Sequence, residues 1–146
     1  MRVELVDPLA PPAWPVGVRV RTYAPTDARP LHGLLVHAYR HGGGEVAPFA
    51  AWLPRMTGDD EFDARLWFLA ESETGLAGAA LCWTSSFVKD LVVHESWRRR
   101  GLGEALLRHA FGELRRRGAG RVDLKVDARN DAARRLYERV GMGVVA

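Results

Sequence analysis

The chain has 146 residues, 47% of them hydrophobic, so it is long enough to enclose one hydrophobic core. Its formal net charge of +3 comes from 19 Arg and 2 Lys spread over several segments, which argues against a basic tail for nucleic acid. The apolar runs are too short to span a bilayer, and no charged-then-apolar leader opens the chain. The single cysteine, Cys82, excludes an intrachain disulfide and lies in an apolar run typical of a buried strand. We expect a soluble cytoplasmic protein of one domain.

The first 17 residues contain four prolines and show no periodicity. They predict a lead-in or linker that packs only through Trp14, so the folded domain is expected over residues 18–146. Residues 18–23 alternate apolar and polar side chains, as a strand with one buried face does.

Two helices and a hairpin are expected next. Thr26 and Asp27 are good helix openers, apolar side chains follow at helical spacing up to Tyr39, and Gly42–Gly44 stop the helix. A short second helix carries Phe49, Trp52, Leu53 and Met56. Residues 66–70 and 76–83 read as a β-hairpin joined by residues 71–75, and residues 87–93 form the next strand.

The last part of the chain predicts a helix, a strand and a helix. The first helix follows Gly103 and ends before Gly118, with Glu104 in its first turn and Arg115–Arg117 in its last, charges that suit the helix dipole. Residues 121–126 alternate as a strand, and residues 131–140 form a helix stopped by Gly141. The predicted order is β-α-α-β-β-β-α-β-α, an α/β fold with a mixed sheet.

The junction between the strand at 87–93 and the helix after Gly103 is the most informative segment. A basic turn with glycines at 101 and 103 lets the main chain approach a ligand closely, and the free N–H groups of the new helix point at it. An anion is the expected ligand at this junction. The Gly-x-Gly-x-x-Gly fingerprint of nucleotide oxidoreductases is absent, because Leu106 occupies its third glycine position.

This junction resembles the acyl-CoA signature of the GCN5-related N-acetyltransferase (GNAT) superfamily, Arg/Gln-x-x-Gly-x-Gly/Ala, matched by Arg98, Gly101 and Gly103. Residues 130–142 are similar to its second signature, Asn-x-x-Ala-x-x-Leu-Tyr-x-x-x-Gly-Phe, with Met142 in place of Phe. Both motifs stand in the right order, one helix and one strand apart. The resemblance implies the GNAT fold and transfer of an acetyl group from acetyl-CoA to a primary amine, directly within a ternary complex.

The resemblance also implies which residues bind acetyl-CoA. The main chain of the strand end pairs with the pantetheine arm, the glycine-bearing turn holds the pyrophosphate, and the last helix lines the cofactor. These residues are Leu91, Val92, Val93, Arg98, Arg99, Arg100, Gly101, Leu102, Gly103, Glu104, Asn130, Ala133 and Tyr137. Asn130 also suits a helix cap, a role compatible with cofactor binding.

The resemblance implies that Tyr137 is the general acid that protonates the departing thiolate, with a purely structural tyrosine as the alternative. The base is chosen from Asp90, His94 and Glu95. Asp90 is preferred because a carboxylate inside a strand is otherwise unfavourable, although a solvated edge position would also explain it. His37 and His41 lie four residues apart without a third ligand at metal spacing, so no metal is expected.

The chain ends differently from the family pattern, in which two further strands follow the last helix. Residues 142–146 can supply one short edge strand at most. A second copy in a homodimer, the proline-rich lead-in, or the rest of a longer protein would then complete the sheet.

Two other functions remain open. One is a non-catalytic GNAT module that binds acyl-CoA within a larger or dimeric assembly, and the other is nucleic-acid binding through the arginine faces, which is not expected. No membrane partner is expected either. The acceptor is a small molecule or a peptide, and the acidic loop at residues 59–63 would favour a cationic amine if it bordered the pocket.

Overall fold

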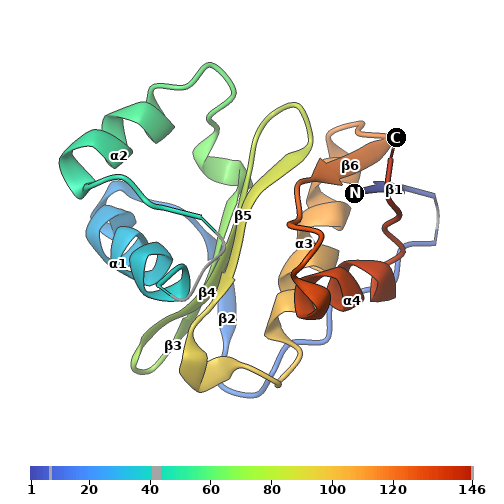
Figure 1. The fold of residues 1–146 in the computed structure, drawn as a ribbon, viewed down its shortest axis with the longest axis horizontal. Coiled ribbons are helices and arrows are strands. Elements are labelled where there is room, and N and C mark those ends of the chain that lie inside the picture. Colours follow the sequence, from blue (N-terminus) through green and yellow to red (C-terminus); the bar gives the residue numbers. More distant parts are fainter. Residues whose placement is uncertain (7, 41–43, 146) are drawn as a thin grey trace.

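The computed structural model describes residues 1–6, 8–40 and 44–145, which form a sheet of six strands and four helices (Figure 1). The elements in chain order are β1 (Arg2–Glu4), β2 (Arg19–Thr22), α1 (Ala28–Ala38), α2 (Phe49–Thr57), β3 (Trp67–Ser72), β4 (Gly75–Cys82), β5 (Phe87–Val93), α3 (Leu102–Arg116), β6 (Arg121–Leu124) and α4 (Asp131–Arg139). From β2 onward this is the predicted order, and the predicted α/β fold with a mixed sheet is confirmed.

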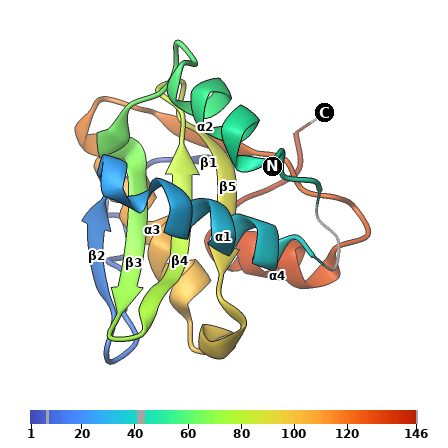
Figure 2. The same ribbon diagram turned by 90° about the vertical axis from the view of Figure 1, so that its left-hand side faces the viewer.

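The strands lie in the order β1-β6-β5-β4-β3-β2, and every neighbouring pair is antiparallel except β5 and β6, which are parallel. Helices α1 and α2 cover one face and α3 and α4 the other (Figure 1). Seen from the α1 side, α1 lies across the central strands of the sheet (Figure 2). Each face buries its own apolar cluster, because α1 and α3 each present an apolar stripe to the sheet.

The lead-in differs from the prediction. Residues 2–4 form strand β1, which pairs with β6, and Arg2 makes a double hydrogen bond to the Asp123 carboxylate at 2.6 and 3.2 Å. Leu5 is only 2% exposed, so the expectation that this segment packs only through Trp14 is wrong. The alternation of Met1, Val3 and Leu5 with polar residues was the signal for this strand.

The lead-in therefore supplies an edge strand to the same sheet as the rest of the chain. The C-terminal segment adds an isolated bridge between Gly143 and Arg2, in agreement with the expectation of one short edge strand at most. The domain limits and the homodimer stay predictions.

Several element ends differ from the predicted ones. Helix α1 ends at Ala38, before the glycines expected to stop it, of which Gly42 and Gly43 lie outside the described residues. Strand β3 continues to Ser72, because Glu71 still pairs with Arg19 across the sheet. Strand β6 ends at Leu124 rather than at residue 126.

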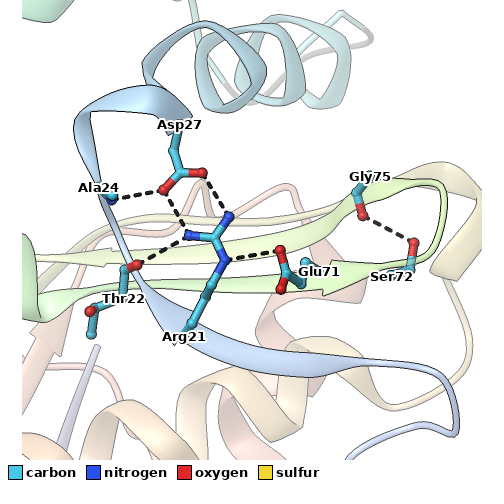
Figure 3. A network of polar contacts seen from close by, with 7 residues as sticks. All are labelled: Arg21, Thr22, Ala24, Asp27, Glu71, Ser72 and Gly75. Carbon is cyan, nitrogen blue, oxygen red and sulfur yellow. Dashed lines mark hydrogen bonds and ion pairs between the residues drawn. The ribbon is translucent and has the colours of Figure 1, made fainter.

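A polar network fixes the start of α1 against the sheet (Figure 3). The Arg21 guanidinium donates to both Asp27 carboxylate oxygens at 2.7 and 2.8 Å and to Glu71 at 2.9 Å. Asp27 also accepts from the backbone N–H of Ala24 at 2.7 Å. Asp27 thus connects β2 to the short helical turn before α1, instead of capping α1 as the sequence suggested.

Candidate active site

Strands β5 and β6 separate soon after they meet. Only Phe87 and Val88 pair with β6, at Asp123 and Leu124, and the two strands then diverge. A cleft of about 840 Å³ lies at this divergence, between the α1–α2 side and α4. Residues that line it and bear on the chemistry are Tyr39, Glu45, Trp52, Arg55, Lys89, Asp90, Leu91, Lys125, Asp127, Asn130, Ala133 and Tyr137.

A β-bulge in β5 determines which way Asp90 points. Cys82 of β4 pairs with Val88 and Leu81 pairs with Asp90, so Lys89 is the extra residue. Val88 packs in the cluster beneath α3, whereas Val92 packs in the cluster beneath α1. Because the bulge reverses the alternation, Asp90 faces α1, where it is buried with 6% exposure. The solvated edge position weighed for Asp90 is therefore wrong.

The edge of β5 that faces away from β4 carries main-chain groups toward the divergence. The N–H of His94 donates to the Ala77 carbonyl of the β4 edge at 2.7 Å. Successive residues of a strand present their main-chain groups to alternate edges, so Leu91 and Val93 present theirs away from β4. The resemblance assigned the main chain of Leu91, Val92 and Val93 to the pantetheine arm. By this alternation Val92 presents its main-chain groups to β4 and not to the open edge.

The turn before α3 has an unusual backbone. Gly101 is the N-cap of α3 with φ of 79°, and Arg99 also adopts a positive φ, of 63°. No side chain caps α3, so the first-turn N–H groups are left for a ligand or solvent. The Arg100 guanidinium lies 4.7 Å from the centre of the Trp97 ring, a cation–π contact within the turn.

The two glycines of this turn serve different purposes. A Cβ at Gly101 would touch nothing within 4 Å, so glycine is needed there only for its backbone conformation. A Cβ at Gly103 would lie 3.2 Å from a methyl group of Leu136, so glycine there lets α3 and α4 pack closely. Glu104 lies in the first turn, but Arg108 at 3.2 Å and Arg139 at 3.5 Å offset its charge.

Asn130, the N-cap of α4, and Tyr137, on α4, belong to the second motif and line the cleft. The Asn130 side chain accepts from the N–H of Ala133 at 3.1 Å, which confirms its role as a cap. Burial raises the pKa of the Tyr137 hydroxyl. The cofactor and acid roles of these residues stay predictions.

Tyr39 is a cleft residue that the sequence analysis did not single out. It follows α1 as its C-cap, and its hydroxyl donates to Asp90 Oδ1 at 2.7 Å. Burial, and then the charge of Asp90, raises the pKa of Tyr39 well above its usual value. In the sequence Tyr39 continues the apolar stripe of a helix, and nothing there indicates a partner 51 residues away.

The other candidate bases lie elsewhere. His94 stacks on His37 with ring centres 5.2 Å apart and accepts the Ser96 N–H at 3.1 Å, while Glu95 lies 3.3 Å from the His37 ring. Neither lines the cleft, so the structure favours Asp90 among the three.

The remaining expectations concern metal ions, the acidic loop and the cysteine. In the part of the chain that the structure describes, no group of three or more His, Cys, Asp or Glu could hold a metal ion, and His41 lies outside that part. Asp63 of the acidic loop pairs with Arg65 and Arg117, and residues 59–63 do not line the cleft. Cys82 is fully buried as expected, and burial raises the pKa of its thiol to about 12.

Within residues 1–6, 8–40 and 44–145, none of the helices has the length and apolar character needed to cross a membrane.

Known proteins are similar to this chain in sequence and in fold. A mycothiol acetyltransferase of Thermobispora bispora is 34% identical over 154 residues, which cover 97% of this chain and 52% of that protein. The [ribosomal protein bS18]-alanine N-acetyltransferase of Escherichia coli is 44% identical over 52 residues, covering 36% of this chain and 35% of that protein. The crystal structure of a GCN5-related N-acetyltransferase from Sphaerobacter thermophilus superposes with a TM-score of 0.85 at 34% identity, over 99% of this chain and 47% of that one.

The chain spans about half the length of the curated mycothiol acetyltransferases that match nearly all of it. Residues 29–142, from α1 to the end of the second motif, match the Acetyltransferase (GNAT) family. On the fold, the two motifs and these matches, this chain belongs to the GNAT family of acetyltransferases.

Proposed function

We propose that the protein transfers an acetyl group from acetyl-CoA to a primary amine, directly and without a covalent enzyme intermediate. The observation that carries this proposal is the divergence of β5 from β6. It leaves a strand edge beside a cleft that holds a buried carboxylate, Asp90, and a tyrosine, Tyr137. The only cysteine is buried in β4 away from the cleft, so no thiol is placed to take the acetyl group.

The residues present fit acetyl-CoA. The left-handed backbone at Gly101 and the uncapped N-terminus of α3 suit a pyrophosphate, with Arg98 and Arg100 adding positive charge. The outward main-chain groups of Leu91 and Val93 suit the amides of the pantetheine arm. Asn130 and Ala133 border the same cleft from α4.

Acetyl-CoA supplies an activated acetyl thioester. Asp90 accepts a proton from the acceptor ammonium, and an outward N–H of β5 stabilises negative charge on the thioester oxygen. A C–N bond forms and the C–S bond breaks, and Tyr137 gives its proton to the departing sulfur. The acceptor nitrogen loses two protons as the ammonium becomes an amide. Asp90 takes the first, and the second passes to the Tyr137 phenolate, directly or through solvent, which restores Tyr137. Asp90 then releases its proton to solvent, so one proton is released per acetyl group transferred.

A second candidate is a module that binds acyl-CoA without turnover. The greater length of the relatives favours it, because this chain covers 52% and 47% of the two mycothiol acetyltransferases that match most of it. In this reading the chain corresponds to one half of a longer protein, and the second half is needed for acetyl transfer.

The test is product formation on a panel of amines, measured by mass spectrometry. The names of the relatives suggest two acceptors, the unacetylated form of mycothiol and an alanine N-terminus, and a polyamine and an aminoglycoside complete the panel. We expect product with at least one amine and a loss of about 100-fold in kcat for Tyr137→Phe. Tyr23→Phe is the matched control, since Tyr23 is buried outside the cleft. Acetyl-CoA binding without product on any amine would favour the non-catalytic module.

A further inference from the structure

We infer that Tyr39 is a positioning residue for acetyl transfer, because its hydroxyl holds the Asp90 carboxylate so that Oδ2 faces the acceptor amine. This inference rests on the proposed function. It adds a residue from α1, outside both sequence motifs, to the machinery formed by β5, α3 and α4.

The two carboxylate oxygens of Asp90 have different surroundings. Oδ1 accepts the Tyr39 hydroxyl at 2.7 Å, the usual length of an O–H···O hydrogen bond. Among the described residues, Oδ2 makes a loose ion pair with Lys89 Nζ at 3.9 Å, and the Lys89 side chain is 46% exposed. One oxygen is therefore engaged inside the protein, and the other is left for a ligand in the cleft.

The Asp90 carboxylate needs such a partner because of where the bulge places it. Asp90 is 6% exposed and packs between the sheet and α1, where a carboxylate without a firm hydrogen bond is costly. Its side chain has two rotatable bonds, and a base must meet its proton within hydrogen-bonding distance and angle. The Tyr39 bond removes this freedom and leaves Oδ2 as the oxygen that points into the cleft.

Tyr39 is suited to be a permanent donor. Its raised pKa favours the protonated hydroxyl, which donates to Asp90 and does not compete for the amine proton. The same charge of Asp90 contributes to this raised pKa. Tyr39 is held in turn by its own backbone, since its N–H donates to the Leu35 carbonyl at 3.0 Å in the last turn of α1.

The test is a double-mutant cycle of Tyr39→Phe and Asp90→Asn, with kcat and both KM values measured on the best amine of the panel. Tyr39→Phe is expected to lower kcat about 10-fold or more and to leave KM for acetyl-CoA unchanged, because a misaligned base slows proton transfer only. In the Asp90→Asn background the same change is expected to cost less than twofold, because its effect passes through the carboxylate.

Two controls separate positioning from structure. Tyr23→Phe removes a hydroxyl from the same apolar cluster, outside the cleft, and its kcat is expected to stay within twofold of that of the unmodified protein. Urea unfolding of each variant shows how much stability is lost. Tyr39→Leu, which also lacks a donor but packs differently, repeats the comparison if Tyr39→Phe is unstable.

The outcomes are distinct. The inference would be overturned if the losses in kcat of the two single variants multiplied in the double variant. It would also be overturned if kcat of Tyr39→Phe stayed within twofold of that of the unmodified protein. Either result would leave the proposed function standing. An unmodified protein that forms no product on any amine would overturn both.

Discussion

Asp27→Asn is expected to destabilise the fold by about 2 to 3 kcal/mol at neutral pH. Asp27 is 6% exposed, and its carboxylate accepts three hydrogen bonds, two from Arg21 and one from the Ala24 N–H. Asparagine keeps the shape but removes the charge and turns one acceptor into a donor that faces the guanidinium. Hydrogen bonds to charged groups contribute about 1.5 to 3 kcal/mol, and breaking a buried ion pair costs about 3 to 5 kcal/mol. The expected loss lies at the low end, because the Arg21 side chain is 36% exposed and keeps Glu71.

The loss should depend on pH in a defined direction. The Arg21 guanidinium lowers the pKa of the Asp27 carboxyl below its ordinary value of 3.8. A carboxyl whose pKa is lower in the folded state stabilises fully above its unfolded pKa, and this stability is lost as the pH falls through the folded pKa. The difference in unfolding free energy between the two proteins is therefore largest near pH 7 and shrinks as the pH falls below the ordinary value of 3.8.

The assay is urea unfolding of both proteins near pH 7 and near pH 3, with Glu71→Gln as the matched control. Glu71 contacts the same guanidinium at 2.9 Å, but its side chain is 37% exposed, so its loss should cost less than about 1 kcal/mol. Two results would refute the assignment of the buried charge to Asp27. One is an equal loss of unfolding free energy in the two variants at pH 7, and the other is a loss in Asp27→Asn that does not change with pH.

Three further predictions concern four glycines and the cysteine. Gly101→Ala forces a left-handed φ on alanine, so we expect it to lower the unfolding free energy by about 1 kcal/mol. We also expect it to lower the affinity for acetyl-CoA about fivefold by titration calorimetry, whereas Gly103→Ala should keep that affinity within twofold of the unmodified protein's. Gly78→Ala places a Cβ 2.8 Å from a β5 carbonyl and should cost about 1 to 3 kcal/mol in urea unfolding, whereas Gly33→Ala, in open space on α1, should gain up to about 1 kcal/mol. Cys82 should not react with a thiol reagent near pH 8 in the folded protein, because burial raises its pKa to about 12, and should react once the protein is unfolded in urea.

Patterns that depend on neighbours in the sequence could be predicted. The apolar stripe of α3, the glycine at its start and the Asn130 cap all express local rules, and they appear where the sequence places them. Strand β1 was missed because its three residues stand before a proline-rich stretch, and only pairing with β6 makes so short a segment a strand.

The Tyr39 contact with Asp90 could not be predicted, because it depends on a β-bulge. In the sequence Val88, Asp90 and Val92 alternate with other residues, as one face of a regular strand does. The extra residue at Lys89 is visible only in the register with β4. Without the bulge, Asp90 would share a face with Val88 and lie beneath α3, away from Tyr39.

The bulge and the divergence of β5 from β6 occur at the same point of the chain. β5 leaves β6 after Val88, and Lys89, the next residue, is the one that bulges against β4. Bulges bend and twist the strand that carries them and are frequent beside active sites. A regular β5 would turn Asp90 to the other face, beneath α3 and away from Tyr39. The orientation of the proposed base therefore depends on the bulge, at the point where the pairing with β6 ends, and a change that removes the bulge should separate Asp90 from Tyr39.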